Sequence, residues 1–322
     1  MSKKYIFLIF STAIISGISI FLNFFAVQLA DPTQYTFARN LFVVLIISAI
    51  FLTGIARRQF GQITKKQWSY LITVGLLGGS IAFILFFEGL ARTSGSTGSF
   101  IHKTIFIWIA LMTPLFLREK VKKIFFIPAI ALLFGNFLLL KVNFQVLTWA
   151  HLLILGATLL WSIENILSKH LLNHKISPLM IIWSRITFGA GFIFIYLLMT
   201  FNLPSIAEFS PSVLIWIAIS GLMLCGYILT WYYGLSRVPV TLASTILLIG
   251  SPITTLLSVL LKGQILIPEQ ILGMLIILAG VVFAVYLFVD VVRKLKTQNS
   301  NVKATTQNSK LQNFGKVYSF KI

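Results

Sequence analysis

The chain has 322 residues, of which 58% are hydrophobic and only 10% are charged, whereas soluble domains carry about 25% charged residues. Its mean hydropathy is +0.95, and a single globule of this size could not bury so much apolar surface, so lipid has to cover the rest. A water-soluble enzyme is excluded, and a membrane protein with many spans is expected.

Ten apolar stretches follow one another along the chain, and each is close to the roughly 20 residues that a membrane-spanning helix needs. The first stretch reaches Leu29, which is too long for a cleaved signal peptide. From Asp290 onward the composition turns polar, which predicts a basic, disordered tail. We expect helices near 5–29, 35–55, 67–91, 96–117, 122–141, 150–172, 177–201, 212–236, 240–261 and 267–289.

The net charge of +19 arises from 26 Lys and Arg against 7 Asp and Glu. Basic residues mark the cytoplasmic side of membrane proteins and meet anionic head groups there, so the charge does not indicate nucleic-acid binding. The N-terminus and the loops on its side hold 13 basic residues, whereas the opposite loops hold only Arg92, Lys103, Lys141 and Lys262. Both termini are therefore predicted to be cytoplasmic.

The two halves of the chain superpose when the sequence is shifted by about 145 residues. Each half has five spans, an odd number, so the second half must enter the membrane with the opposite polarity. We therefore expect an all-α fold of inverted five-helix repeats over 1–145 and 146–289, followed by the tail 290–322, as in many secondary transporters. The matching positions are Pro32 and Arg39 with Pro178 and Arg185, Gly89 with Gly234, and Gly135 with Gly280.

The sequence resembles the drug/metabolite transporter superfamily, specifically the EamA-type transporters, over about residues 5–289. The resemblance rests on the ten spans, the repeat, the paired Pro-to-Arg openings of helices 2 and 7, and the end of the second half. It implies a multi-pass metabolite transporter in the cell membrane. The motifs of the second half are Thr241-Leu242-Ala243-Ser244-Thr245, Gly250-Ser251-Pro252, Pro268-Glu269-Gln270, Gly273 and Ala279-Gly280-Val281.

Some positions depart from the family pattern. The acidic residue after helix 4 is present as Glu119, but its counterpart after helix 9 is Gln264. Pro252 has Ile107 as its counterpart in the first half, and helix 4 opens with an unusual His102-Lys103 pair. A particular substrate therefore does not follow from the resemblance.

Charged groups within a bilayer cost about 2.5–3.5 kcal/mol each on insertion scales, so those kept at depth are functional candidates. They are Arg39, Glu88, Lys103, Glu164 and Arg185. Glu88 and Lys103 could meet across the hairpin of helices 3 and 4. They would then form either a structural ion pair or a substrate site in which Lys103 holds a carboxylate or phosphate.

Glu164 and Asn165 lie in helix 6, toward the predicted cytoplasmic half. Carboxyl groups at such depth serve proton relays in transporters, so Glu164 is the preferred candidate for proton coupling or amine recognition. The alternative is an ion pair with Arg185 across helices 6 and 7. Arg39 and Arg185 occupy equivalent repeat positions, which suggests either bonds to helix ends and lipid head groups or a role in gating.

Other candidates come from helix irregularity and polar or aromatic stripes. Pro252 removes a backbone hydrogen bond near the middle of helix 9, and the helix could be kinked or broken there, with carbonyls lining a cavity. Tyr227 and Trp231 form a stripe that suits either packing or substrate stacking. Ser16 and Asn23 belong to a polar stripe on helix 1 that suits interhelical bonds or a wet pathway.

No enzymatic motif is present, and neither a metal nor a cofactor is expected. The single cysteine, Cys225, has no partner for a disulfide. These features predict an exporter of an amino acid, amine or related metabolite that works by alternating access and uses protons, as a monomer or a homodimer among membrane lipids. The alternatives are an organic-anion uptake or exchange transporter, and a membrane scaffold or lipid-handling protein.

Overall fold

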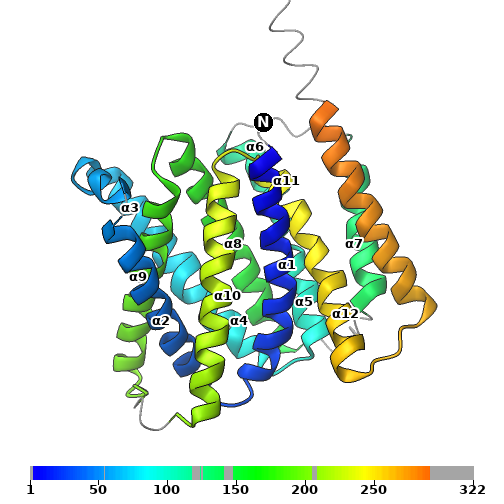
Figure 1. Ribbon diagram of the computed structural model, residues 1–322, viewed down its shortest axis with the longest axis horizontal. Helices are drawn as coiled ribbons and strands as arrows, with labels where there is room; N and C mark the ends of the chain where they lie inside the picture. Colours follow the sequence, from blue (N-terminus) through cyan, green and yellow to red (C-terminus); the bar gives the residue numbers. More distant parts are fainter. Residues whose placement is uncertain are drawn as a thin grey trace, which may run out of the picture. The chain divides into compact units, whose positions relative to one another are not determined.

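The computed structural model describes residues 3–53, 55–117, 124, 126–140, 148–204 and 209–290 (Figure 1). The chain forms two compact units, Met1–Val281 and Val282–Ile322. In the second unit, the described residues 282–290 are helical. The predicted tail from 291 onward, Glu119 and Lys141 lie outside the described residues.

The first half contains the five expected helices within its described residues. Its third helix is continuous but passes through a π-helical segment, and its fourth is interrupted at Thr104. The elements are α1 Lys3–Ala26, α2 Pro32–Thr53, the 3₁₀ helix η1 Ile55–Gln62, α3 Lys65–Val74, the π-helix η2 Gly75–Ile81, α4 Ala82–Leu90, α5 Gly95–Lys103, α6 Ile105–Phe116 and α7 Phe126–Leu140.

The second half has the same order of helices. Its second and third helices begin with Pro178 and Pro211, each preceded by a serine whose side chain caps the first turn. The elements are α8 Trp149–Asn173, α9 Pro178–Met199, α10 Pro211–Leu235, α11 Val240–Ile246, the 3₁₀ helix η5 Leu247–Ile249, α12 Gly250–Lys262 and a last helix Pro268–Asp290.

Within the described ranges, nine helices are long and apolar enough to cross a membrane, and Phe126–Leu140 is a shorter apolar helix. The predicted ten-helix, all-α membrane fold is confirmed. Large apolar side chains cover the outside of these helices, and Leu115 and Leu260 are each 76% exposed. Lipid is the solvent that such a surface requires.

The fourth helix of each half is irregular at the same place in the repeat. In the first half, Thr104 separates α5 from α6, and in the second half η5 separates α11 from α12. Thr104 and Ile249 differ by the 145-residue shift found in the sequence. The irregularity predicted for helix 9 near Pro252 is therefore present, although it begins before the proline.

The two halves interlock through equivalent pairs of helices. Helix α1 packs against α10 and α12, and its counterpart α8 packs against α4 and α6. Figure 1 shows α1 and α10 side by side. The second helices, α2 and α9, pack against each other. Each half therefore completes the packing of the other, as expected for inverted repeats.

Glycines allow the closest of these approaches. A Cβ atom added at Gly79 in η2 would meet the backbone oxygen of Arg185 in α9, and one added at Gly189 would meet the backbone of Gly79. By contrast, a Cβ atom added at Gly191 would meet no atom within 4 Å. The backbones of η2 and α9 thus lie in direct contact at Gly79, as small residues permit in membrane helices.

We predict that Gly79→Ala lowers stability, because the new methyl group must push two backbones apart, which costs about 1–3 kcal/mol. The matched control is Gly191→Ala, which raises helix propensity similarly and meets open space. Thermal unfolding of both variants in detergent measures the difference. Equal melting temperatures for the two would contradict the contact.

Candidate functional site

A partly open cavity lies among the helices of the first unit, with a volume of about 100 Å³. This is room for several water molecules or a small organic solute. Both repeats contribute to its wall, through α1, α2, α4, α5 and α6 from one and α8, α9 and α10 from the other. The predicted site residues that line it are Ser16, Asn23, Arg39, His102, Glu164, Asn165, Arg185, Tyr227 and Trp231.

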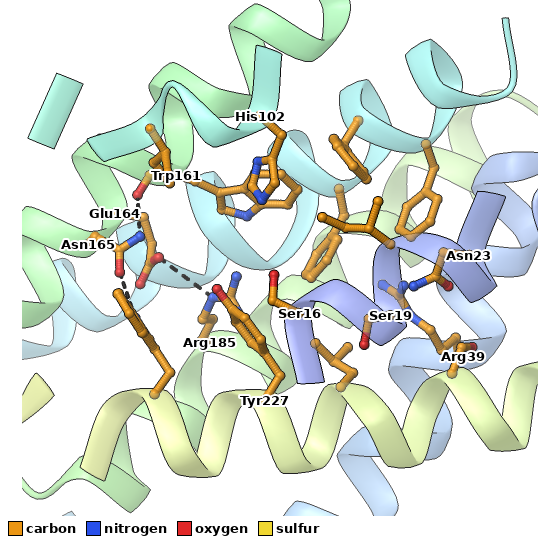
Figure 2. Close-up of a pocket in the computed structure, with 18 of the residues that line it drawn as sticks. Ser16, Ser19, Asn23, Arg39, His102, Trp161, Glu164, Asn165, Arg185 and Tyr227 are labelled. Atoms are coloured by element: carbon orange, nitrogen blue, oxygen red, sulfur yellow. Dashed lines mark hydrogen bonds and ion pairs between the residues drawn. The ribbon is translucent and has the colours of Figure 1, made fainter. Parts of the chain in front are cut away.

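Glu164 and Arg185 face each other on the cavity wall (Figure 2). The Nε atom of Arg185 lies 3.9 Å from Oε2 of Glu164. The other carboxylate oxygen, Oε1, accepts hydrogen bonds from the hydroxyls of Ser168 and Tyr232. Both charged groups are buried, with exposed fractions of 1% and 5%. The alternative that paired these two residues is therefore the arrangement present.

The π-helical segment supplies the next contacts. The carbonyl oxygen of Gly78 accepts hydrogen bonds from Nη2 of Arg185 at 2.9 Å and from Nε1 of Trp161 at 3.0 Å. The carbonyl of Gly79 accepts one from Asn40 at 3.3 Å. A π-turn disturbs the regular backbone ladder, which explains why these carbonyls bind side chains. Gly78 also leaves room for the side chain of Glu164.

Arg39 reaches the cavity from α2, and its exposed fraction is only 2%. Its guanidinium carbon lies 4.8 Å from the ring centre of Phe83 and 4.7 Å from that of Phe87, at cation–π distances. Its Nη2 donates to Asn40 at 2.9 Å. Of the alternatives for Arg39 and Arg185, contact with lipid head groups is wrong, because both side chains are buried among the helices. A role in gating stays a prediction.

The aromatic stripe of α10 closes one part of the wall. Tyr227 stacks on Trp231 with ring centres 6.4 Å apart. The Nε1 atom of Trp231 donates to Oδ1 of Asn165 at 2.7 Å, and Nδ2 of Asn165 donates to the carbonyl of Trp161. The stripe packs within the helix bundle and also faces the cavity, whereas substrate stacking stays a prediction.

Some polar atoms of α1 and α5 face the cavity and have no hydrogen-bond partner among the described residues. Within the described part of the chain, Ser19 Oγ, Asn23 Oδ1 and His102 Nδ1 are buried and have no hydrogen-bond partner. The His102 ring lies against Phe86 and Trp161, with ring centres 5.2 Å and 5.0 Å away. Unfilled polar atoms on a cavity wall are suited to binding water or a polar ligand.

The predicted meeting of Glu88 and Lys103 is wrong. Glu88 forms an ion pair with Arg92, one turn further along the same helix face, and accepts a hydrogen bond from Thr33. Lys103 turns toward α1 and η5 instead, and its Nζ donates to Ser16 Oγ at 3.0 Å and to the carbonyl of Leu247 at 3.1 Å. Neither residue lines the cavity, but Ser16 links Lys103 to it.

Pro252 is buried and does not line the cavity. A carbonyl of the irregular segment before it, that of Leu247, is bound by Lys103 rather than by a solute. The described residues of α11, η5 and α12 do not line this cavity, but Thr254, Thr255 and Ser258 of α12 line a second one. That carbonyls of the break serve a solute stays a prediction.

Several important residues were not predicted. The rings of Phe83 and Phe87 are spaced one helical turn apart in α4, a signal that the aromatic-rich sequence hides. Trp161 precedes Glu164 in the same helix and bonds to Gly78. His, Cys, Asp and Glu side chains within the described residues form no group of three or more that could hold a metal ion.

These features define a membrane protein of many spans with a cavity between two repeats whose wall contains buried charged groups. The profile of the EamA-like transporter family matches residues 3–141 and again residues 148–286. The chain therefore belongs to the EamA-like transporter family, and it is a membrane transporter of small solutes. This confirms the resemblance found in the sequence. The family is one of transporters and not of enzymes.

The fold is also present among solved structures. One crystal structure superposes with a TM-score of 0.68 at 17% sequence identity, over 87% of this chain and 96% of that chain. At this identity the likeness extends to the fold alone. No curated protein matches the chain.

We predict that Tyr232→Phe lowers stability by about 1.5–3 kcal/mol, because it removes a hydrogen bond to a buried carboxylate. The control is Tyr233→Phe, whose ring is 39% exposed. Thermal unfolding in detergent compares them. A Tyr232→Phe variant as stable as the control would contradict the bond to Glu164.

A double-mutant cycle on Glu164→Gln and Arg185→Gln tests the buried pair. Each single change leaves one charge without its partner, and we expect a loss of about 3–5 kcal/mol in each case. The double variant is expected to lose less than the sum, with a coupling of about 0.5–3 kcal/mol.

The reference cycle uses the partly exposed pair of Glu88 and Arg92, for which we expect a coupling of about 0–1 kcal/mol. Additive losses at Glu164 and Arg185 would show that the two charges do not stabilise each other.

Proposed function

We propose that this transporter moves a small organic metabolite, an amino acid, an amine or a related compound, across the cell membrane by alternating access. The observation that carries the proposal is the cavity, which lies where the two repeats meet and has buried charged side chains on its wall. Charges in a bilayer are expensive and mark solute or ion pathways. Substrate sites of inverted-repeat transporters lie at the interface of the repeats.

The contacts around the cavity support a rocking mechanism. On α10, Trp231 bonds to Asn165 of α8, and Thr230 accepts a hydrogen bond from Thr12 of α1 at 2.8 Å. About ten residues earlier on α10, Tyr35 of α2 bonds to Ser220. The bonds of Thr230 and of Ser220 each join helices of different repeats, whereas Trp231 and Asn165 belong to the same repeat. Opening one of the two bonds between repeats while the other stays closed would expose the cavity to one side.

Glu164 is the group that we assign to proton coupling. It is buried, faces the cavity and is paired with Arg185. Proton uptake would remove its negative charge and free the arginine for other partners. Such a change alters the charge of the cavity without moving a helix. It also couples proton uptake by Glu164 to the binding of a solute by Arg185.

We further propose export across the plasma membrane, with both termini cytoplasmic. The excess of basic residues on the N-terminal side supports this orientation. Organic-anion uptake or exchange is a second candidate, favoured by the two arginines on the cavity wall. In that case Arg39 and Arg185 would attract the anion, rather than Lys103.

The test is flux into liposomes that contain the purified protein. Radiolabelled amino acids, amines and organic acids are screened with and without an imposed pH gradient. We expect gradient-driven uptake, and a loss of about tenfold or more in Glu164→Gln, since a charged partner of the site is gone.

Glu88→Gln serves as the control, because Glu88 is a carboxylate of α4 outside the cavity. Uptake that ignores both the gradient and the Glu164 change would refute proton coupling through this residue. No flux of any compound would refute the transport of these metabolites.

A further inference from the structure

The cavity carries an excess of positive charge. Among its described lining residues, the guanidinium groups of Arg39 and Arg185 stand against one carboxylate, that of Glu164. Both guanidinium carbons lie within 5.3 Å of the ring centre of Phe83, from which Arg39 is 4.8 Å away. Aromatic faces attract cations, but they do not neutralise them. An anion in the cavity would balance the charge.

Arg185 has donors that are ready to bind such an anion. Its exposed fraction is 5%, and its Nη2 donates to Gly78. Its Nη1 atom is buried without a hydrogen-bond partner among the described residues, whereas its Nε atom, also without a hydrogen bond, faces Oε2 of Glu164 at 3.9 Å. A buried donor that makes no hydrogen bond costs free energy, and the cost is larger when the donor is charged than when it is neutral. A guanidinium binds carboxylates with strong, charge-assisted hydrogen bonds.

Glu164 is less suited to binding the amine of a substrate. One of its oxygens already accepts from Ser168 and Tyr232, and the other faces Arg185. Its place explains a different role, in which it holds the guanidinium of Arg185 in position. Glu164 is therefore a positioning residue for the anion site.

Acceptors for a second group of the substrate lie elsewhere on the wall. In the described part of the cavity, Ser19 Oγ and Asn23 Oδ1 of α1 have no hydrogen-bond partner. The amide oxygen of Asn23 can only accept. An ammonium or hydroxyl group on the substrate would satisfy it.

We propose that the cavity selects small organic carboxylates, which bind through their carboxylate to Arg185 with Arg39 adding positive charge, and that simple amines are not its substrates. The proposal rests on the proposed transport function and narrows its substrate class. Amino acids and hydroxy acids belong to this class, because they carry the carboxylate that Arg185 would bind.

Matched ligands test the choice of group. One set has an aromatic skeleton: phenylalanine, its decarboxylated amine phenylethylamine, and 3-phenylpropionate, which lacks the amine. The other set has an aliphatic skeleton: leucine, isopentylamine and 4-methylpentanoate. Binding of each compound to the purified full-length protein is measured as a shift in melting temperature and by isothermal titration.

We expect the carboxylate-bearing compounds of at least one skeleton to bind about tenfold or more tightly than the corresponding amine, as one charge-assisted hydrogen bond suffices for this factor. In Arg185→Gln/Glu164→Gln, which removes both members of the ion pair and leaves Arg39 as the remaining charge on the wall, this preference is expected to fall to the smaller part that Arg39 provides. Arg39→Gln is expected to weaken binding of carboxylates and not of amines.

Arg92→Gln is the control, because Arg92 is an arginine outside the cavity and more than half exposed. Amines that bind as tightly as the carboxylates, carboxylate binding unchanged in the double variant, or no binding of any compound would each overturn the proposal. Liposome flux separates this from the transport function. Flux of amines alone would refute carboxylate selection and support transport. Carboxylate binding without flux would support carboxylate selection and refute transport.

Discussion

The contact of Arg185 with the π-helical segment is the interaction on which the rest of the site depends. A guanidinium in the middle of a membrane needs protein atoms in place of water. Here the carbonyl of Gly78 and the carboxylate of Glu164 provide them, from the third and sixth helices. Gly78 lets the third helix come close to Glu164 of α8, and Gly79 lets it come close to the backbone of α9. Charge, backbone irregularity and close packing thus support one another at one place.

The interlocked repeats explain why the cavity exists where it does. Each first helix packs against the third and fourth helices of the other half, so neither half has a complete core alone. The space left along this seam is lined by polar groups from both halves. The outside of the same helices is apolar and meets lipid. The fold thus places its costly polar groups together, where they can satisfy one another or bind a solute.

The sequence was sufficient to predict the helices, because long apolar runs and the lipid environment leave few alternatives. It also identified most of the charged residues at depth, including Glu164 and Arg185. It failed for Lys103, because the direction of that side chain depends on the helix break at Thr104, which no residue type announces. The sequence also did not predict the role of Gly78, since its carbonyl becomes an acceptor for Arg185 only because the helix is π-helical there. The position of a residue along its helix could be predicted from the sequence, but the direction in which its side chain points could not.

The two arginines also reveal how far the repeats have diverged. Arg39 and Arg185 are equivalent by position, yet Arg185 has a carboxylate 3.9 Å away, and the residue that corresponds to Glu164 in the first half is Ser19. Identical inverted repeats would make the inward-facing and outward-facing conformations equal in free energy. A charge present in only one repeat removes this equality. Under the alternating-access mechanism proposed above, the protein would therefore favour facing one side of the membrane even when no solute is bound and no ion gradient is present.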